Sequence, residues 1–344
     1  MADVLLQPYV DAIGEFPLTG TPAEQLRAVV KYAVLAPSSH NAQPWLFRVS
    51  ENQIALYADR SRGLPVVDPY DRELVIGCGA ALFQLRIALR HFGCAETVVL
   101  TPDPADPDLL AQVRLSGSRE PTDEEHALFA AIPRRRTTRF PFADRPLSAN
   151  VLGALAAAAA PEGAWLQFLK SPRARDTAAD LVAQGDRLQM ADEHFRRELA
   201  SWLRGHHGRR DDGMPGFALG FRDIMASVGP LVVRTFDLGD GRAARNRELA
   251  IGSPALAVLG TAGDSPVDWL EAGQALARVL LRAEVEGVTA SFLNQPIEVP
   301  ELRPALQALV SGTGCAQVLV RFGYKPPTAP KPTPRRPVKQ VLIE

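Results

Sequence analysis

The sequence has little of what several common classes of protein depend on. Its three cysteines are scattered and form neither a paired metal-binding motif nor an even disulfide set, which favours a reducing cytoplasm and gives no reason to expect a metal site. Lysine and arginine (38) balance aspartate and glutamate (39), so no charge excess predicts a nucleic-acid or membrane partner. The motifs GxSxG, HExxH and GxxxxGK(S/T) are absent, so hydrolase, zincin and P-loop functions lack support.

Long apolar runs are also missing. The longest, Val151–Ala160, is rich in alanine, stops at Pro161 and has about half the length that a bilayer span requires. Residues 1–10 have no basic segment, so a secretory signal is not expected there. With 46% apolar residues in 344, the chain is expected to fold around a large core in the cytoplasm.

Two segments of the chain repeat the same order of elements. Thr21–Leu35 predicts a capped helix that stops at an Ala-Pro pair, and Trp45 then opens a strand after a loop. Ser148–Ala160 predicts a second capped helix with the same stop, and Trp165 opens the strand that follows. Both tryptophans are expected in the core.

A long helix comes next in both segments. Leu74–Phe92 and Trp269–Glu286 are predicted helices, each closed by a glycine and followed by two strands. Each contains a second glycine 14 positions before the closing one: Gly79 before Gly93, and Gly273 before Gly287. Because Gly79 lies inside this helical pattern, Ile76–Leu82 is interpreted as helix packing and not as a dinucleotide-binding turn.

This repeat predicts an α+β fold, an internally duplicated single-chain pseudo-dimer. The first half covers 21–117 and the second 134–344, which includes a proline-rich C-terminal arm at 325–344. The second half carries an insertion at about 171–263, interpreted as a lid. Aromatic residues that could shape this lid are Trp202, Phe217 and Phe221, and His206-His207 beside Asp211-Asp212 is interpreted as an exposed loop.

The loops of the two halves have different chemistry. Pro37–Pro44 holds two hydroxyls, two amides and an imidazole, which suit a planar ring with several N and C=O groups, whereas Pro161–Ala164 has none of this set. Arg134–Arg139, before the second half's first helix, combines four arginines with two threonines and suits a phosphate, whereas Phe16–Gly20 has no cation. Each half thus lacks the segment that the other half has, as expected of a fused dimer in which one of two symmetric sites has been lost. A mononucleotide-like cofactor such as FMN fits it.

These segments resemble the nitroreductase-like FMN flavoproteins. Pro37–Trp45 resembles their flavin-contact loop, and Arg135–Arg139 resembles their RRSxR phosphate signature with threonine for serine. Val288–Pro296 is similar to the stretch beneath the isoalloxazine ring, and Pro334–Pro337 to the C-terminal arm that returns an arginine to the phosphate. The double repeat, with Asp59–Arg62 after the first loop, resembles the Acg-like branch.

The resemblance implies one FMN between the halves and no metal. It assigns these residues to the cofactor: Pro37, Ser38, Ser39, Asn41, Gln43, Arg135, Arg136, Thr137, Arg139, Ser291, Leu293, Asn294, Gln295, Arg335 and Arg336. Asn294 and Gln295 stand where family members often have a Glu-Gly pair near flavin N5. No catalytic acid or base stands out.

The resemblance implies an FMN-dependent oxidoreductase that takes hydride from NADH or NADPH and reduces a small organic acceptor, such as a quinone or a nitro compound. Two alternatives stay open. One is a protein that binds, sequesters or stores FMN with little turnover, and the other is a specialised flavin enzyme such as a dehalogenase or a flavin-fragmenting enzyme. A monomer would suffice for one site, and further oligomerisation stays open.

Overall fold

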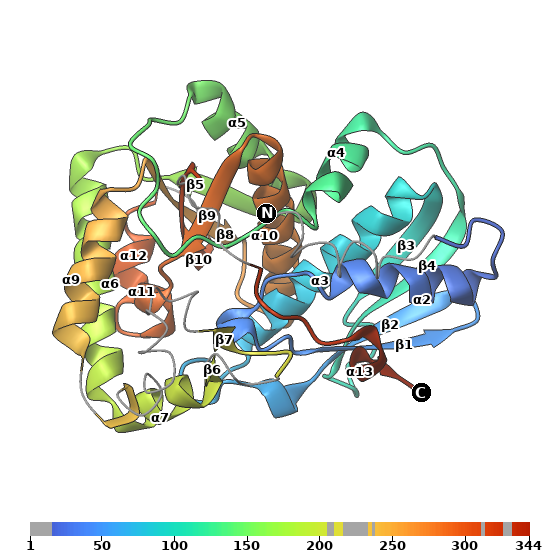
Figure 1. The fold of residues 1–344 in the computed structure, drawn as a ribbon, viewed down its shortest axis with the longest axis horizontal. Coiled ribbons are helices and arrows are strands. Elements are labelled where there is room, and N and C mark those ends of the chain that lie inside the picture. The colour runs from blue at the N-terminus through green and yellow to red at the C-terminus, as the bar shows by residue number, and fades with distance from the viewer. Residues whose placement is uncertain (1–15, 205–209, 216–232, 236–237, 311–313, 326–331) are drawn as a thin grey trace.

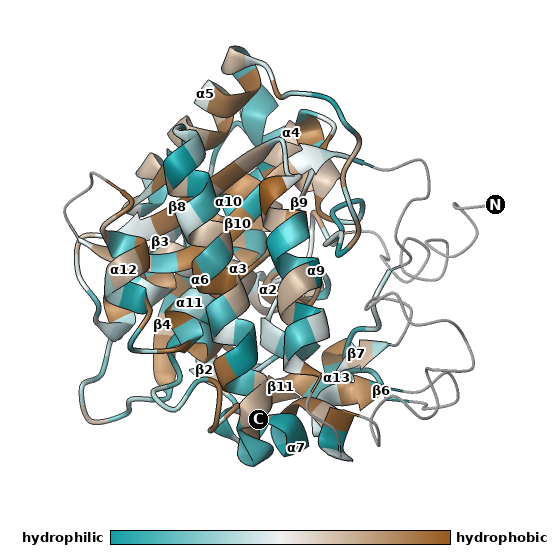
Figure 2. Ribbon diagram, turned by 90° about the vertical axis from the view of Figure 1, so that its left-hand side faces the viewer, coloured by the Kyte–Doolittle hydropathy of each residue, from teal (hydrophilic) through white to brown (hydrophobic). Residues whose placement is uncertain are grey.

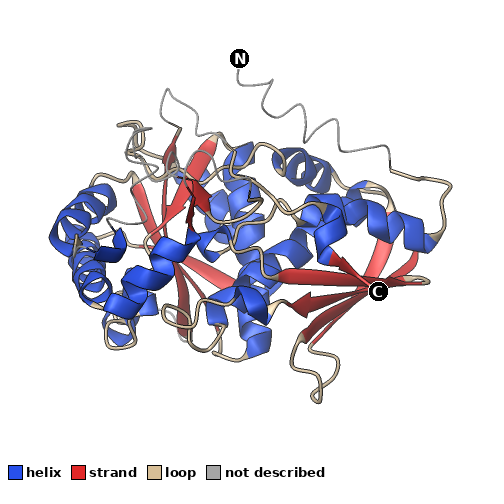
Figure 3. Cartoon of the chain, turned by 60° about the horizontal axis from the view of Figure 1, so that its bottom comes forward, coloured by secondary structure: helices blue, strands red, loops and turns tan. Residues whose placement is uncertain are grey.

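The computed structural model describes residues 16–204, 210–215, 233–235, 238–310, 314–325 and 332–344. Two main sheets, antiparallel apart from one short parallel edge strand, lie apart from each other, with long helices between them (Figure 3). The α+β fold and its internal duplication are confirmed.

The two halves contain the same six elements in the same order. The first half has α2 (Pro22–Ala33), β1 (Trp45–Ser50), β2 (Gln53–Ala58), α3 (Arg72–His91), β3 (Cys94–Leu100) and β4 (Leu109–Ser118). The second has α5 (Ala149–Ala157), β5 (Ala164–Phe168), β8 (Ala255–Thr261), α10 (Pro266–Val285), β9 (Val288–Phe292) and β10 (Cys315–Tyr324). The strand orders, β1-β2-β4-β3 and β5-β8-β10-β9, correspond strand for strand.

The predicted helix ends are present. Thr21 caps α2 in a capping box with Glu24, and Ser148 caps α5 by accepting a hydrogen bond from the Val151 amide. Gly93 and Gly287 follow α3 and α10 in the left-handed region, with φ of 78° and 70°. Their lack of a Cβ allows the chain to leave both helices in the same way.

The two long helices pack against each other at their matching glycines. A Cβ on Gly273 would lie 2.1 Å from the Ile76 carbonyl oxygen, and one on Gly79 would lie 2.4 Å from the Leu270 carbonyl oxygen. Only glycine therefore permits this approach of α3 to α10. By length and composition α3 could cross a membrane, but 83% of its apolar stretch is buried, as in the core helix of a soluble protein.

The insertion separates β5 from β8, at the place where a two-residue turn joins β1 to β2. It contributes α6 (Pro172–Ala191), α7 (Glu193–Trp202), β6 (Leu203–Arg204), β7 (Met214–Pro215) and α9 (Gly239–Ile251). The expected range of 171–263 extends too far, because β8 at 255–261 is the counterpart of β2. The expected lid residues Phe217 and Phe221, and the pair His206-His207, lie outside the described residues.

Shorter elements complete the chain. Helix α4 (Asp123–Ala131) joins the halves, and the turns η2 (Ser39–Asn41), η3 (Arg60–Arg62) and η4 (Ala160–Glu162) lie in the loops. Helices α11 (Gln295–Glu298) and α12 (Arg303–Gln307) precede β10, and α13 (Val338–Val341) and β11 (Leu342–Ile343) end the arm. Strand β11 pairs in parallel with β1, so the end of the second half completes the first half's sheet (Figure 1).

The hydrophobic core forms several clusters. Trp45 is fully buried in the first half's cluster, and half-buried Trp165 packs on a second-half cluster, which places both tryptophans as predicted. In β8, Ala257 and Leu259 face one cluster, whereas Leu256 and Val258 face another. This strand is therefore buried on both sides.

Candidate functional site

A cavity of about 1480 Å³ is lined by both halves and by the insertion. Of the fifteen residues assigned to a cofactor, thirteen line it: Pro37, Ser38, Ser39, Asn41, Arg135, Arg136, Thr137, Arg139, Ser291, Leu293, Asn294, Gln295 and Arg335. Segments separated by up to about 300 positions in the sequence thus meet around one space.

Gln43 and Arg336 are not among the lining residues. The Arg336 amide donates to Gln43 Oε1 (2.8 Å), and Arg336 Nη1 donates to the Gln43 carbonyl oxygen (3.0 Å). Arg336 also forms an ion pair with Asp59 (3.3 Å). These contacts hold the C-terminal arm to the first loop, and the assignment of both residues to the cofactor stays a prediction.

The first loop has an unusual backbone. His40, Asn41 and Gln43 all have positive φ, between 50° and 56°, which is costly for residues with a Cβ. The hydroxyl of Ser38 accepts a hydrogen bond from the Gln43 amide (2.9 Å) and so holds the loop in this shape. Burial lowers the pKa of His40 to about 3, with Arg242 and Arg139 adding to the shift, so its imidazole is neutral.

Glu73, at the start of α3, connects the two halves at the cavity wall. It accepts hydrogen bonds from the Ser39 hydroxyl of the first half and from Asn294 Nδ2 of the second (3.0 Å). The Leu319 amide donates to Asn294 Oδ1 (3.0 Å), so both ends of that side chain are held. Sequence reasoning missed Glu73, because an acidic residue in the first turn of a helix is common without any functional role.

The arginines Arg135 and Arg335 converge on one backbone oxygen. Their Nη2 atoms lie 3.4 and 3.5 Å from the Leu35 carbonyl oxygen, although one arginine precedes α5 and the other lies on the arm. Arg135 is buried, and its Nε has no hydrogen-bond partner in the described structure. Burial, followed by repulsion from Arg335 and Arg136, lowers the pKa of Arg135 to about 9. A buried cation among like charges is stabilised by an anion, and a phosphate suits these guanidinium groups.

Arg139 lies in a different environment. Its Nη2 is 3.8 Å from Met214 Sδ of the insertion, and burial together with Arg242 lowers its pKa to about 10. Arg321 Nη2 donates to the carbonyl oxygens of Thr138 (2.9 Å) and Phe140 (3.0 Å), on either side of Arg139. Sequence reasoning missed Arg321, although a charged residue in the middle of an apolar strand was a usable signal.

The insertion contacts the first loop directly. Asn41 Nδ2 donates to the Gly213 carbonyl oxygen (3.0 Å), and the Gly213 amide donates to the Asn41 carbonyl oxygen (3.2 Å). Gln43 Nε2 donates to the Asp211 carbonyl oxygen (2.7 Å), and Arg62 pairs with Asp212. The insertion therefore covers this end of the cavity, as a lid would.

This arrangement defines a class of protein. Both halves of a duplicated chain line the cavity, with a loop rich in hydrogen-bonding groups from one half and buried arginines beside the other. Such a chain is a single-chain pseudo-dimer whose two halves form walls of a nucleotide-sized cavity.

Comparison with known proteins gives the family. The chain is 36% identical over 324 residues to "Putative NAD(P)H nitroreductase Rv3131" of Mycobacterium tuberculosis, covering 93% of this chain and 91% of that protein. It is 29% identical over 336 residues to "Putative NAD(P)H nitroreductase acg" of the same organism, covering 95% and 97%. The chain therefore belongs to the nitroreductase-like family, in the branch that includes Acg.

Other comparisons are more distant. The solved FMN-dependent nitroreductase NfnB of Mycobacterium smegmatis, in complex with NADPH, is 16% identical and covers 63% of this chain and 97% of its own, with a TM-score of 0.41. No family model matches the chain.

Proposed function

We propose that this protein is an FMN-dependent oxidoreductase that takes hydride from NADH or NADPH and reduces a small organic acceptor, such as a quinone or a nitro compound. The proposal rests on what lines the cavity. The loop at 37–41 offers hydrogen-bonding groups for a ring, and buried Arg135 has an Nε donor without a hydrogen-bond partner in the described structure. Its relatives in the family carry NAD(P)H nitroreductase names, which supports the same reaction class.

The residues fit FMN at both ends. Arg135, Arg136, Thr137 and Arg335 would hold the phosphate, because they line one region of the cavity and include a buried guanidinium with an unused donor. The loop at 37–41 would hold the ring, with Asn294 and Gln295 on the side of the second half. When bound, FMN would supply the redox chemistry, and the chain supplies binding, orientation and exclusion of water.

Positioning is the main task of the protein groups. Glu73 fixes Ser39 and Asn294 relative to each other, so the two halves cannot shift independently at the ring site. The insertion covers the same loop and reduces access of bulk water. Because one chain supplies both parts of the site, a monomer would suffice.

A second candidate function is FMN sequestering or storage with little turnover. The hydrogen bonds from Asn41 and Gln43 to the insertion favour it, because a lid held to the ring-binding loop slows exchange of substrates. The two functions share the same cofactor site and differ in turnover.

Three measurements on the purified protein test these proposals. Its absorbance spectrum and its heat-released cofactor should show one FMN per chain. Steady-state oxidation of NADH and NADPH with menadione should then show turnover, whereas negligible turnover by fully flavinated protein would favour storage. Protein that is colourless and takes up no added FMN would contradict both functions. Intact FMN on mass spectrometry after aerobic reduction would exclude flavin breakdown.

A further inference from the structure

The cavity holds more positive charge than one flavin phosphate can neutralise. A phosphate monoester carries about −1.5 to −2 at neutral pH. Three acidic residues line the cavity within the described part of the chain: Glu73, Asp240 and Glu298. Eight arginines line it there: Arg135, Arg136, Arg139, Arg187, Arg242, Arg245, Arg321 and Arg335.

These arginines form two separate groups. Arg135 and Arg335 meet at Leu35, as described above, and belong to the proposed phosphate site. The second group surrounds Arg139: Arg245 Nη2 lies 3.4 Å from the Arg139 carbonyl oxygen, and Arg242 is close enough to Arg139 to lower its pKa.

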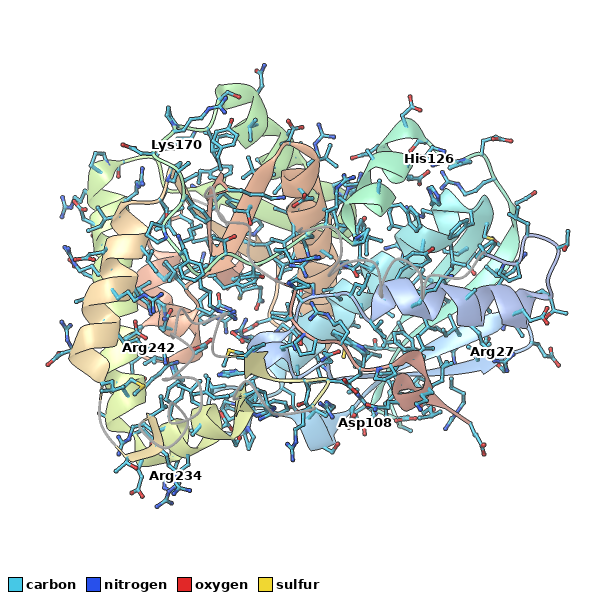
Figure 4. The ribbon with its side chains drawn as sticks, in the orientation of Figure 1. Arg27, Asp108, His126, Lys170, Arg234 and Arg242 are labelled. Atoms are coloured by element: carbon cyan, nitrogen blue, oxygen red, sulfur yellow. The ribbon has the colours of Figure 1, made fainter. Side chains whose placement is uncertain are left out.

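The insertion supplies half of this second group. Helices α6 and α9 pack side by side at one end of the molecule (Figures 1 and 2), and Arg242 and Arg245 are three positions apart on α9, hence on one face of it. Figure 4 labels Arg242 beside this helix. The family's duplicated frame alone would therefore lack this cationic wall.

Among the residues that the structure describes, few acids oppose the second group. Arg242 Nε pairs with buried Asp186 (2.6 Å), which also accepts hydrogen bonds from Asn246 (2.8 Å) and Gln295 (3.2 Å). Glu298 contributes little charge, because burial, followed by repulsion from Glu73, raises its pKa to about 8. Asp240 pairs with Arg187 at the surface.

One buried cation of this group has unused donors. Arg321 is 1% exposed and lines the cavity, and its Nε and Nη1 have no hydrogen-bond partner in the described structure. The guanidinium lies over the Phe142 ring, 4.3 Å from Cζ to the ring centroid, but this contact uses no N–H donor. An anion in the cavity would satisfy the two nitrogen atoms that lack a hydrogen-bond partner.

We propose a second oxyanion site, formed by Arg139 and Arg242 with Arg321 behind them, that binds a carboxylate or phosphate on the second ligand of the cavity. This inference rests on the proposed function, since it takes the flavin phosphate to occupy the Arg135 site, and it moves Arg139, which the resemblance assigned to the cofactor, to the second ligand. The oxyanion belongs either to the acceptor or to the nicotinamide dinucleotide, and the two sources share the same recognition chemistry.

Two probes of similar size test the site. The compounds 4-nitrobenzoate and 4-nitrobenzyl alcohol carry the same ring and nitro group and differ in charge. By calorimetry on FMN-saturated protein, we expect the benzoate to bind about tenfold more tightly, the effect of one charge-assisted contact. Arg242→Gln should remove this preference, and Arg247→Gln, a control on the same helix whose arginine pairs with exposed Asp180, should keep it.

Several results would overturn the inference. Equal binding of both probes to the wild type would do so without any variant, and so would an undiminished preference in Arg242→Gln. Misfolding of that variant is guarded against, because Asp186 keeps its Asn246 and Gln295 donors. If the variant nonetheless loses FMN, Arg245→Gln replaces it and should weaken the preference.

Two further measurements identify the source of the oxyanion and separate this inference from the proposed function. Stronger displacement of the benzoate by NADP⁺ than by NAD⁺ would assign the site to the 2′-phosphate of the dinucleotide, and equal displacement by both would assign it to the pyrophosphate that they share. Displacement by neither would assign it to the acceptor. Turnover with menadione is measured separately. Turnover without a preference for the charged probe would support the proposed function and reject this site. A preference for the charged probe without turnover would support this site and reject the proposed function.

Discussion

The two halves share one topology, but their sheets face different surroundings. In the first half, the edge strand β3 alternates between partly buried and exposed residues, and Val99 is 54% exposed. In the second half, the corresponding edge strand β9 is buried except at partly buried Phe292. Its sheet is covered on both faces: β8 is buried throughout, because the core around α10 covers one side and a cluster containing α6 residues covers the other. The insertion thus added a layer to one half of a symmetric frame and brought new side chains to a cavity that both halves already shared.

The largest expected effect tests the contact between α3 and α10, to which the two halves contribute matching glycines. Gly273→Ala should lower the free energy of unfolding by about 3 kcal/mol or more, since its Cβ would meet the Ile76 carbonyl oxygen, which is rigid backbone. Gly79→Ala should cost a similar amount at the same crossing. Urea denaturation of both variants measures this, and a tolerated substitution at either position would show that the crossing is not equally tight from both sides.

The next prediction tests whether the phosphate of FMN binds at Arg135. Arg135→Ala should weaken FMN binding by roughly 1.5–3 kcal/mol, because a buried charge-assisted contact is lost. Arg134→Ala is the matched control, since the side chain of Arg134 is 53% exposed and forms a long ion pair with Glu284, at 3.9 Å. FMN titration followed by fluorescence gives both affinities. Equal retention of FMN by the two variants would place the phosphate elsewhere.

The next experiment varies the pH and tests Glu298, a carboxylate that lines the cavity from the second half. With a folded-state pKa of about 8, Glu298 keeps its proton after the unfolded chain has lost it, so wild-type stability should fall as pH rises from about 4.5 to 8. Glu298→Gln should remove this fall, worth at least about 1.4 kcal/mol, the equivalent of one pKa unit. Parallel stability curves for variant and wild type between pH 5 and 8 would contradict this.

The smallest effect is a gain. Gly153 lies within α5, and a Cβ there would meet nothing within 4 Å. Gly153→Ala should therefore stabilise the fold by up to about 1 kcal/mol, through helix propensity alone. Thermal unfolding measures it, and it doubles as the control for Gly273→Ala. A loss of stability would mean that α5 has an unseen neighbour.

Much of the frame follows from local rules. The caps at Thr21 and Ser148 and the closing glycines Gly93 and Gly287 were predicted because each satisfies backbone groups within a few residues. Strand β8 was missed, because a strand buried on both faces has no polar alternation to mark its register.

The site was predictable in part. The loop at 37–41 and the arginines at 135–139 carry unusual chemistry in short segments, and they do line the cavity. Arg242 and Glu73 could not be found in this way, since their role depends on which distant segment lies opposite them. That Gln43 and Arg336 bind each other could not be predicted either, for the same reason.

The pairing of β11 with β1 has a consequence for synthesis on the ribosome. The first half emerges early, yet β1 keeps an unpaired edge, and the pocket that Val341 fills stays empty, until the segment at 338–343 has also been made. An open edge of this kind is prone to pair with other chains. A ribosome that stalls between the two halves and β11 would therefore release a chain whose first sheet has an aggregation-prone edge.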